Sequence, residues 1–240
     1  MELKGQTALV TGGAVRIGRA LCEALAAEGV NVVVHYRHSG DEAQALCADL
    51  ERRGVRAWAV AAELTSGAAC ADLVARATTV AGPLAILINN AAVFHKDHLL
   101  ATTEAKLLEE FWPNLFAPLL LMRAFAAGSA GGKIINLLDR RIAGHDETCV
   151  PYVLTKKALA ELTLLAAREL APQFTVNGVA PGAVLPPPGR GADYLHDQAG
   201  PSPLQKLITP QAVAEAVLAL LRHDALTGQI LFVDGGQHLL

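Results

Sequence analysis

The sequence predicts an α/β fold: a single domain spanning residues 1–240, built on one doubly wound parallel sheet of about seven strands with helices on both faces. Three observations predict it. Short β-branched runs alternate with longer segments rich in Ala and Leu, an alternation typical of parallel strands joined by helical crossovers. The short runs are apolar on both faces, as strands covered on both sides are. No linker-like stretch divides the chain.

The predicted elements follow one another in a regular order. The strands are 7–11, 31–36, 56–62, 84–90, 133–138, 174–180 and 230–235. The segments 16–29, 41–53, 66–81, 102–127, 152–171 and 210–222 between them have helical length and composition. One stretch breaks the rhythm, because residues 183–207 are rich in Pro and Gly. We expect a substrate loop or lid there, and a surface insertion is the alternative.

Composition and charge narrow the class of protein. The formal net charge is −3 and the pI is near 6.2, so charge gives no reason to expect nucleic acid as a partner. The four cysteines show no C-x-x-C spacing, which favours free thiols in a reducing compartment over a disulfide framework. The first residues lack the apolar core of a signal peptide, and no apolar run reaches the roughly 18 residues of a membrane-spanning helix. We therefore expect a cytoplasmic protein without a membrane partner.

A glycine turn follows the first predicted strand, in TALVTGGAVRIGRAL (7–21). Gly12 and Gly13 would let the backbone turn tightly beside a pyrophosphate, and Gly18 would allow close contact between helix and strand. The spacing differs from G-x-G-x-x-G, so a purely structural turn is the alternative.

The end of the second predicted strand, HYRHS (35–39), indicates which dinucleotide would bind. An acidic residue that would hold the ribose hydroxyls of NAD is missing there. Arg37, His38 and Ser39 instead offer positive charge and hydrogen-bond donors, with Arg16 available from the first turn. Donors without a carboxylate favour a 2′-phosphate, hence NADP(H). The alternative is that Arg37 and His38 are solvated loop residues.

A carboxylate, a phenol and an ammonium group follow the fifth predicted strand: Asp139, Tyr152 and Lys156. Tyr152 and Lys156 are four residues apart on a predicted helix and therefore share one face. An ordinary phenol titrates near pH ~10, and a neighbouring ammonium lowers that pKa because it favours the phenolate. Tyr152 is then a candidate general acid, with Lys156 tuning it and binding a ribose hydroxyl. Asp139 ends the preceding strand.

The order of these motifs resembles the short-chain dehydrogenase/reductase family over about residues 5–236. The matching segments are TGGAVRIG, the INNAA after the fourth strand, the asparagine of FWPNLFAP, Y-V-L-T-K and VNGVAPG. The resemblance implies a Rossmann-type fold, oxidoreductase activity on a small molecule, and usually a homotetramer or homodimer. It also implies catalytic roles for Asn114, Tyr152 and Lys156, to which we add Asp139 in the place of the family's usual serine.

The resemblance and the second strand together imply NADP(H) as the cofactor. Asn90, Ala91 and Ala92 would lie along it, Glu63 would stand for the acid that holds the adenine, and Pro181 and Gly182 would border the nicotinamide. The full expected cofactor set is Gly12, Arg16, Ile17, Gly18, Tyr36, Arg37, His38, Ser39, Glu63, Leu64, Asn90, Ala91, Ala92, Tyr152, Lys156, Pro181, Gly182 and Val184.

Two departures from the family pattern are shared with one branch, so the chain resembles the pteridine reductases, including bacterial dihydromonapterin reductases. These departures are Asp139 and Arg16, the latter in place of the middle glycine of the turn. Phe94 falls where that branch places an aromatic residue against the pterin ring. Ala92 stands where some pteridine reductases have a serine. The resemblance implies Arg16, Phe94, Asp139 and Tyr152 as substrate-binding residues.

The aspartate bears on the type of reaction. An ionised carboxylate only accepts hydrogen bonds, so it would repel the developing oxyanion of a ketone but suits a substrate with ring N–H groups. We therefore expect hydride transfer to a C=N carbon of a dihydropterin, with Asp139 and Tyr152 as a coupled proton relay and Phe94 stacked on the ring. Arg16 would pair with the cofactor phosphates and a pterin oxygen. The alternative for Asp139 is a strand-end cap paired with Arg140 or Arg141.

The sequence also allows alternative functions and contains further candidate site residues. The chain would alternatively reduce another carbonyl, C=N or C=C substrate, or bind NADP(H) as a sensor without turnover. HKDH (95–98) offers candidate metal ligands, but three so close on a loop rarely have suitable geometry, and we expect no metal. Cys149 reads as a loop thiol. Sequence does not decide whether His145 or His196 approaches the substrate.

Overall fold

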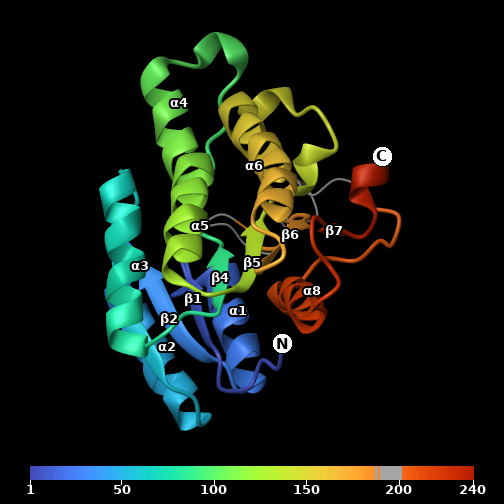
Figure 1. Cartoon of the computed structure of the whole chain (residues 1–240). Coiled ribbons are helices and arrows are strands. Elements are labelled where there is room, and N and C mark those ends of the chain that lie inside the picture. Colours follow the sequence, from blue (N-terminus) through green and yellow to red (C-terminus); the bar gives the residue numbers. More distant parts are fainter. Residues whose placement is uncertain (187–188, 190–201) are drawn as a thin grey trace.

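The structure, a computed structural model, describes residues 1–186, 189 and 202–240. The described strands form one seven-stranded sheet in the order β3-β2-β1-β4-β5-β6-β7, and every neighbouring pair is parallel. Helices lie on both faces of this sheet (Figure 1). The predicted α/β fold with seven parallel strands is confirmed.

The elements coincide with the predicted ones to within about a turn, with one exception. The strands are β1 (Thr7–Val10), β2 (Asn31–Tyr36), β3 (Ala57–Ala61), β4 (Ile86–Asn89), β5 (Gly132–Leu137), β6 (Phe174–Pro181) and β7 (Ile230–Val233). The main helices are α1 (Arg16–Ala27), α2 (Gly40–Arg52), α3 (Gly67–Ala81), α4 (Glu104–Phe111), α5 (Ala117–Gly128), α6 (Val150–Glu169) and α8 (Pro210–Arg222).

Successive residues of the central strands feed two separate cores, as a strand that is buried on both faces requires. In β1, Val10 packs with α1, α2 and α8 on one face of the sheet, whereas Leu9 packs with α3, α5 and α6 on the other. Val33 and Leu87 follow Leu9 into the second core, in register with it across the strands. The two apolar faces explain why the strands read as continuous hydrophobic runs.

The helix predicted over 102–127 is wrong as a single element. Thr103 caps α4, and a π turn (Trp112–Phe116) then separates α4 from α5. Pro113 lies in this turn, and a proline cannot donate to the carbonyl four residues before it and sterically opposes it, which distorts an α-helix. Such π turns are frequent at functional sites, and this one carries Asn114.

The chain reverses its direction of winding between β1 and β4, which are neighbours in the sheet although β2 and β3 intervene in sequence. In open α/β sheets, ligands bind beyond the carboxyl ends of the strands at such a point. The turns after β1, β4 and β5 therefore meet at the expected cofactor crevice. Of the predicted substrate loop 183–207, residues 187–188 and 190–201, including Asp193, Tyr194 and His196, lie outside the described residues.

Candidate active site

The carboxylate of Asp139 and the hydroxyl of Tyr152 face one another, as the sequence predicted. Asp139 follows β5 and Tyr152 lies in the first turn of α6. The phenol donates to Asp139 Oδ2 at 3.1 Å. The tyrosine is buried, and the aspartate side chain is only 14% exposed. Burial strengthens this contact because little water competes for either group.

Asp139 is also a cap and an ion-pair partner. Its Oδ1 accepts from the Arg141 backbone N–H at 2.8 Å, which starts a short 3₁₀ turn (Arg140–Ile142). The Arg141 guanidinium donates to both carboxylate oxygens at 3.2–3.3 Å, and its Nε donates to Asp146 at 2.8 Å. The alternative of a capping carboxylate paired with an arginine therefore holds together with the contact to Tyr152, and the arginine is Arg141. The negative charge beside Tyr152 is largely balanced.

The expected lowering of the Tyr152 pKa is not what the structure gives. Burial and the neighbouring Asp139 carboxylate raise the pKa of this phenol well above its ordinary value. Lys156 does not reverse this, because its ammonium donates to the Leu137 carbonyl at 2.8 Å and lies 5.8 Å from the ring centre. Burial also lowers the pKa of Lys156 to about 8, against the opposing pull of Asp139 and Glu110. Tyr152 thus holds its proton firmly at neutral pH.

Asn114 is completely buried and bonded to the loop that follows β4. Its Oδ1 accepts from the Val93 N–H, and its Nδ2 donates to the Val93 carbonyl, both at 2.9 Å. The same Nδ2 donates to Glu110 Oε2 at 2.7 Å. The π turn brings this amide against the backbone next to Phe94.

Glu110 and His95 were not predicted as site residues. Glu110 Oε1 accepts from the His95 backbone N–H at 2.8 Å and lies 2.9 Å from His95 Nδ1. The glutamate side chain is 2% exposed, and burial raises its pKa. The sequence carried only a weak signal for it, namely a carboxylate one helical turn before the expected catalytic asparagine.

Phe94 lies directly over the Tyr152 ring. The two rings are perpendicular, with centroids 4.8 Å apart, an arrangement that aromatic pairs favour. The Arg141 guanidinium lies 5.3 Å from the centre of the Phe94 ring. Phe94 nevertheless remains 42% exposed, so part of its ring is open to a ligand.

The glycine turn after β1 has the geometry that a dinucleotide pyrophosphate needs. Gly12 has a φ of +60°, and a Cβ there would come within 3.1 Å of the Ala91 backbone. A Cβ on Gly18 would sit 2.0 Å from the Gly12 carbonyl oxygen, so no other residue fits. Two backbone segments therefore approach one another as closely as this cofactor motif requires.

A buried histidine, which sequence reasoning also missed, supports this turn. Gly12 N–H donates to His35 Nδ1 at 3.1 Å, and His35 Nε2 lies 3.2 Å from the Ala62 carbonyl. An imidazole that accepts at one nitrogen and donates at the other is neutral. Burial favours the same form and lowers the pKa of His35 to about 4.

Thr11 joins the ends of β1 and β4. Its hydroxyl accepts from the backbone N–H groups of Asn90 and Ala91 at 2.9 and 3.0 Å. The Asn90 side chain donates to the carbonyls of Thr11 and Gly12 at 2.8 and 3.0 Å. Asn90 and Ala91 therefore border the glycine turn as expected, and the exposed Ala92 follows them.

Arg16 begins α1, directly after the glycine turn. It has a φ of +57°, which is uncommon for a residue with a side chain and is stabilised only by its surroundings. Its guanidinium donates to the carbonyls of Pro186 and Leu185 at 3.0 and 3.3 Å. It therefore ties the first turn to the start of the predicted substrate loop, while the neighbouring Ile17 is partly buried against the core beneath the turn.

The expected 2′-phosphate residues lie together at the ends of β2 and β3. Arg37 and Glu63 are both about half exposed and form an ion pair, so a phosphate would compete with Glu63 for this guanidinium. His38 is exposed, Ser39 precedes α2, and Leu64 is buried. Tyr36 packs over Gly40, where an added Cβ would lie 3.3 Å from its ring.

On the other side of the crevice, Pro181 ends β6 and is followed by Gly182 and the buried Val184. A Cβ on Gly182 would meet Asp234 at 3.0 Å. The Asp234 carboxylate is fixed by the His238 backbone N–H at 2.7 Å and by its ring at 2.9 Å.

The remaining candidates have other roles in the fold. In the HKDH segment, His95 bonds to Glu110, and Asp97 pairs with Lys106. No group of three or more His, Cys, Asp or Glu residues suited to a metal ion occurs in the described part of the chain.

Burial raises the pKa of Cys149 to about 11, which makes it an unreactive thiol. Within the described residues, no helix is both long and apolar enough to span a membrane.

Comparisons with known proteins agree with this geometry. A family model described as enoyl-(acyl carrier protein) reductase matches residues 13–238. Pteridine reductase 1 of Leishmania tarentolae is 31% identical over 277 residues, which cover 97% of this chain and 96% of that relative. The 3-oxoacyl-(acyl-carrier-protein) reductase FabG of Staphylococcus epidermidis is 32% identical over 247 residues, which cover 98% and 99%.

Solved structures give the same result. FolM alternative dihydrofolate reductase 1 from Brucella canis, in a crystal structure complexed with NADP, superposes with a TM-score of 0.94 at 32% identity. The match covers 100% of this chain and 96% of that one. The chain therefore belongs to the short-chain dehydrogenase/reductase family of oxidoreductases.

Proposed function

We propose that the protein is an NADPH-dependent reductase of a pteridine-type substrate, which it converts from the dihydro to the tetrahydro form. The observation that carries the proposal is the Asp139 carboxylate 3.1 Å from the Tyr152 hydroxyl, beside a partly open Phe94 ring. The pteridine reductase 1 and FolM relatives support it.

The residues of the crevice fit an NADP(H) cofactor. The close backbone approach at Gly12 and Gly18 suits a pyrophosphate, and Arg37 suits a 2′-phosphate. Lys156, buried and held by the Leu137 carbonyl, would bind a ribose hydroxyl. When bound, NADPH supplies the hydride.

Tyr152 and Asp139 would have different roles, Tyr152 as the proton donor and Asp139 as a hydrogen-bond acceptor. Because its pKa is raised, Tyr152 enters the reaction as a neutral phenol able to donate its proton to the ring nitrogen of a C=N bond. Asp139 would accept from the N–H groups of the ring, as a carboxylate does. A phenolate beside this carboxylate is unfavourable, so Tyr152 would quickly regain a proton.

Carbonyl reduction is the second candidate, and one observation favours it. Arg141 donates to both oxygens of Asp139, so the carboxylate repels a developing oxyanion less than an unpaired one would. The FabG relative supports this alternative. Asp139 still cannot donate a hydrogen bond to that oxyanion, which leaves the pterin better matched.

The two candidates differ in the expected effect of one substitution. NADPH oxidation would be followed with dihydrobiopterin and with a panel of ketones and 3-oxoacyl thioesters. We expect turnover of the pterin and about a 100-fold lower kcat/KM for it in Asp139→Ser, because general acid–base contributions are of this size. Tyr152→Phe serves as the inactive reference. Turnover of ketones alone, improved by Asp139→Ser, would overturn the pterin assignment.

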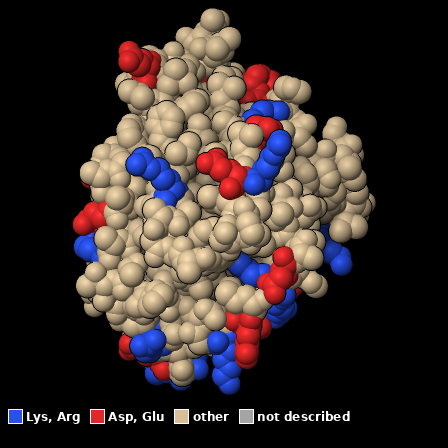
Figure 2. Space-filling model, in the orientation of Figure 1, with Lys and Arg blue, Asp and Glu red and all other residues tan. Residues whose placement is uncertain are grey.

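We also propose that the chain assembles as a homodimer or homotetramer through α4, α5 and α6. These helices carry exposed leucines, namely Leu108, Leu119, Leu154, Leu164 and Leu165. In Figure 2 the upper part of the view, over α4 and α6, shows uncharged surface with several charged side chains scattered over it. Apolar patches of this kind on otherwise polar proteins mark interaction sites.

A further inference from the structure

We propose that a pocket next to Asp139, lined by Arg140 and Arg141, binds a carboxylate on the tail of the substrate. The inference rests on the proposed pterin reduction and names the substrates it favours: pterins whose tail ends in an acid, such as dihydrofolate, over pterins with a neutral tail.

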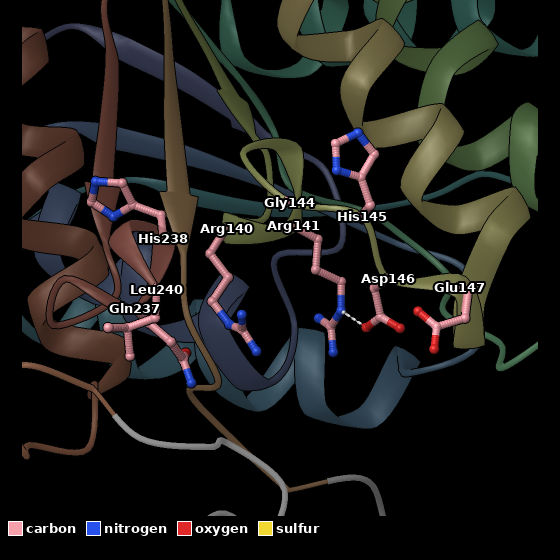
Figure 3. A pocket seen from close by; sticks show the side chains of 9 residues that line it. All are labelled: Arg140, Arg141, Gly144, His145, Asp146, Glu147, Gln237, His238 and Leu240. Carbon is pink, nitrogen blue, oxygen red and sulfur yellow. Dashed lines mark hydrogen bonds and ion pairs between the residues drawn. The ribbon is translucent and has the colours of Figure 1, made fainter.

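The pocket has a volume of about 300 Å³ and lies between the turn after β5 and the C-terminal segment. The residues that line it are Arg140, Arg141, Gly144, His145, Asp146, Glu147, Gln237, His238 and Leu240. Figure 3 shows the Arg140 and Arg141 side chains extending side by side in the same direction, with Gln237 near the end of Arg140. Two guanidinium groups are thus presented together, a few residues from the catalytic carboxylate.

The two arginines differ in how their charge is satisfied. Arg141 is engaged by Asp139 and Asp146. Arg140 is partly buried, and within the described part of the chain no hydrogen bond or ion pair reaches its guanidinium. Burial and the like charge of Arg141 lower its pKa, although the carboxylates of Asp139, Asp234 and Asp146 act in the opposite direction. A partly buried guanidinium with open donors is the group best suited to bind a carboxylate in a bidentate manner.

The acidic residues of the pocket do not fill this role. Asp146 accepts from Thr148 through both its backbone N–H and its hydroxyl, and from Arg141. Its pKa is lowered because the charged form is so fully bonded. Figure 3 places Glu147 beyond Asp146, on the far side from Arg140. The free donors therefore lie at the Arg140 end.

Arg141 connects the pocket to the reaction site. Its guanidinium lies 5.3 Å from the Phe94 ring centre and bonds to Asp139, while its side chain forms one wall of the pocket. Arg140 directly follows Asp139 in the chain, so its Cα atom lies about 3.8 Å from that of the residue with the proposed catalytic carboxylate. A substrate ring on Phe94 would therefore have its tail directed along Arg141 towards Arg140.

The test compares two substrates in matched variants. The kcat/KM of Arg140→Gln would be measured with dihydrofolate, whose tail is anionic, and with dihydrobiopterin, whose tail is neutral. We expect at least about a tenfold loss for dihydrofolate, the size of one charge-assisted hydrogen bond, and less than about a twofold change for dihydrobiopterin. Arg140→Lys should recover part of the loss. Arg168→Gln, an exposed arginine at the other end of α6, is the control.

Equal losses for the two substrates, or none, would overturn the inference. Thermal unfolding of Arg140→Gln checks that it is folded. Should the wild type turn over no pterin, the proposed function fails, and binding of p-aminobenzoylglutamate by calorimetry then tests the pocket alone. Weaker binding in Arg140→Gln than in Arg168→Gln upholds the carboxylate site, and identical binding or none in the wild type refutes it.

Discussion

At the scale of single residues, the site consists of charges that neutralise or oppose one another over short distances. Asp139 raises the pKa of Tyr152 while Arg141 balances Asp139. The sequence predicted that Asp139 and Tyr152 meet, which the structure confirms, and motif position singled out Asn114, whose amide the structure places against Val93. It did not predict Glu110 or His35 as site residues, because His95 and the turn at Gly12 reach them from segments that only the fold brings together. It offered Arg141 only in the alternative for Asp139.

Glu110 is expected to position Asn114 and the loop that carries Phe94. In Glu110→Ala, Asn114 and His95 lose a buried acceptor, which costs about 1–3 kcal/mol. We expect kcat to fall at least about tenfold with the KM for NADPH unchanged, measured by steady-state kinetics.

Glu110→Gln is the informative intermediate, because it retains one acceptor and turns an amino group towards a donor. It should retain more activity than Glu110→Ala. The adjacent and exposed Glu109 provides the control in Glu109→Ala. A kcat equal to that of the wild type in Glu110→Ala would show that these contacts do not matter for turnover.

His35 makes stability depend on pH. Its pKa is about 4 in the folded protein and ~6.5 when unfolded, so between these values the unfolded chain binds the extra proton. Stability is therefore full above pH ~6.5 and falls as the pH decreases towards 4, by about 2 kcal/mol at pH 5 for this residue. Urea denaturation at pH 7 and pH 5 measures it.

In His35→Gln the loss between pH 7 and pH 5 should be smaller by about the same amount, because glutamine keeps an acceptor and does not titrate. His223→Gln, an exposed histidine, should leave the loss as in the wild type. If His35→Gln retains the full pH dependence, His35 is not its origin.

At the scale of elements, the sheet and most helices followed from periodicity and turn residues. The strands are short apolar runs bounded by polar or glycine residues, and such runs predict buried strands from local sequence alone. The interruption of the 102–127 segment was missed, because the apolar spacing continues across it and only Pro113 marks the change. The broken helix is what delivers Asn114 to the loop after β4.

Pro113→Ala should separate stability from activity. It restores an N–H donor and removes up to about 3 kcal/mol of helix-disfavouring preference, so the melting temperature should stay equal or rise. The π turn would then relax towards an α-helix and rotate Asn114 away from Val93, and kcat should fall at least about tenfold. Melting curves and kinetics on the same preparation measure both. An unchanged kcat with a raised melting temperature would contradict this role of the turn.

At the scale of the whole molecule, two cores cover the faces of the sheet, and α4, α5 and α6 carry exposed leucines outside them. Leu165 on α6 is 57% exposed. If α4, α5 and α6 form an interface, sedimentation should give a dimer or tetramer, and Leu165→Glu should shift it towards monomer, because a charge is costly inside an apolar contact. Val80→Glu on α3, also exposed, should not. A monomeric wild type would contradict the proposed assembly.

The most direct measurement is a crystal structure of the protein with NADP⁺ and dihydrobiopterin bound together. The proposed function requires the pterin ring to lie between Phe94 and the nicotinamide. It also requires a ring nitrogen within ~2.6–3.2 Å of the Tyr152 hydroxyl and a ring N–H donating to Asp139. A ring bound away from Phe94, or an Asp139 that contacts only Arg141 while the substrate lies elsewhere, would contradict it.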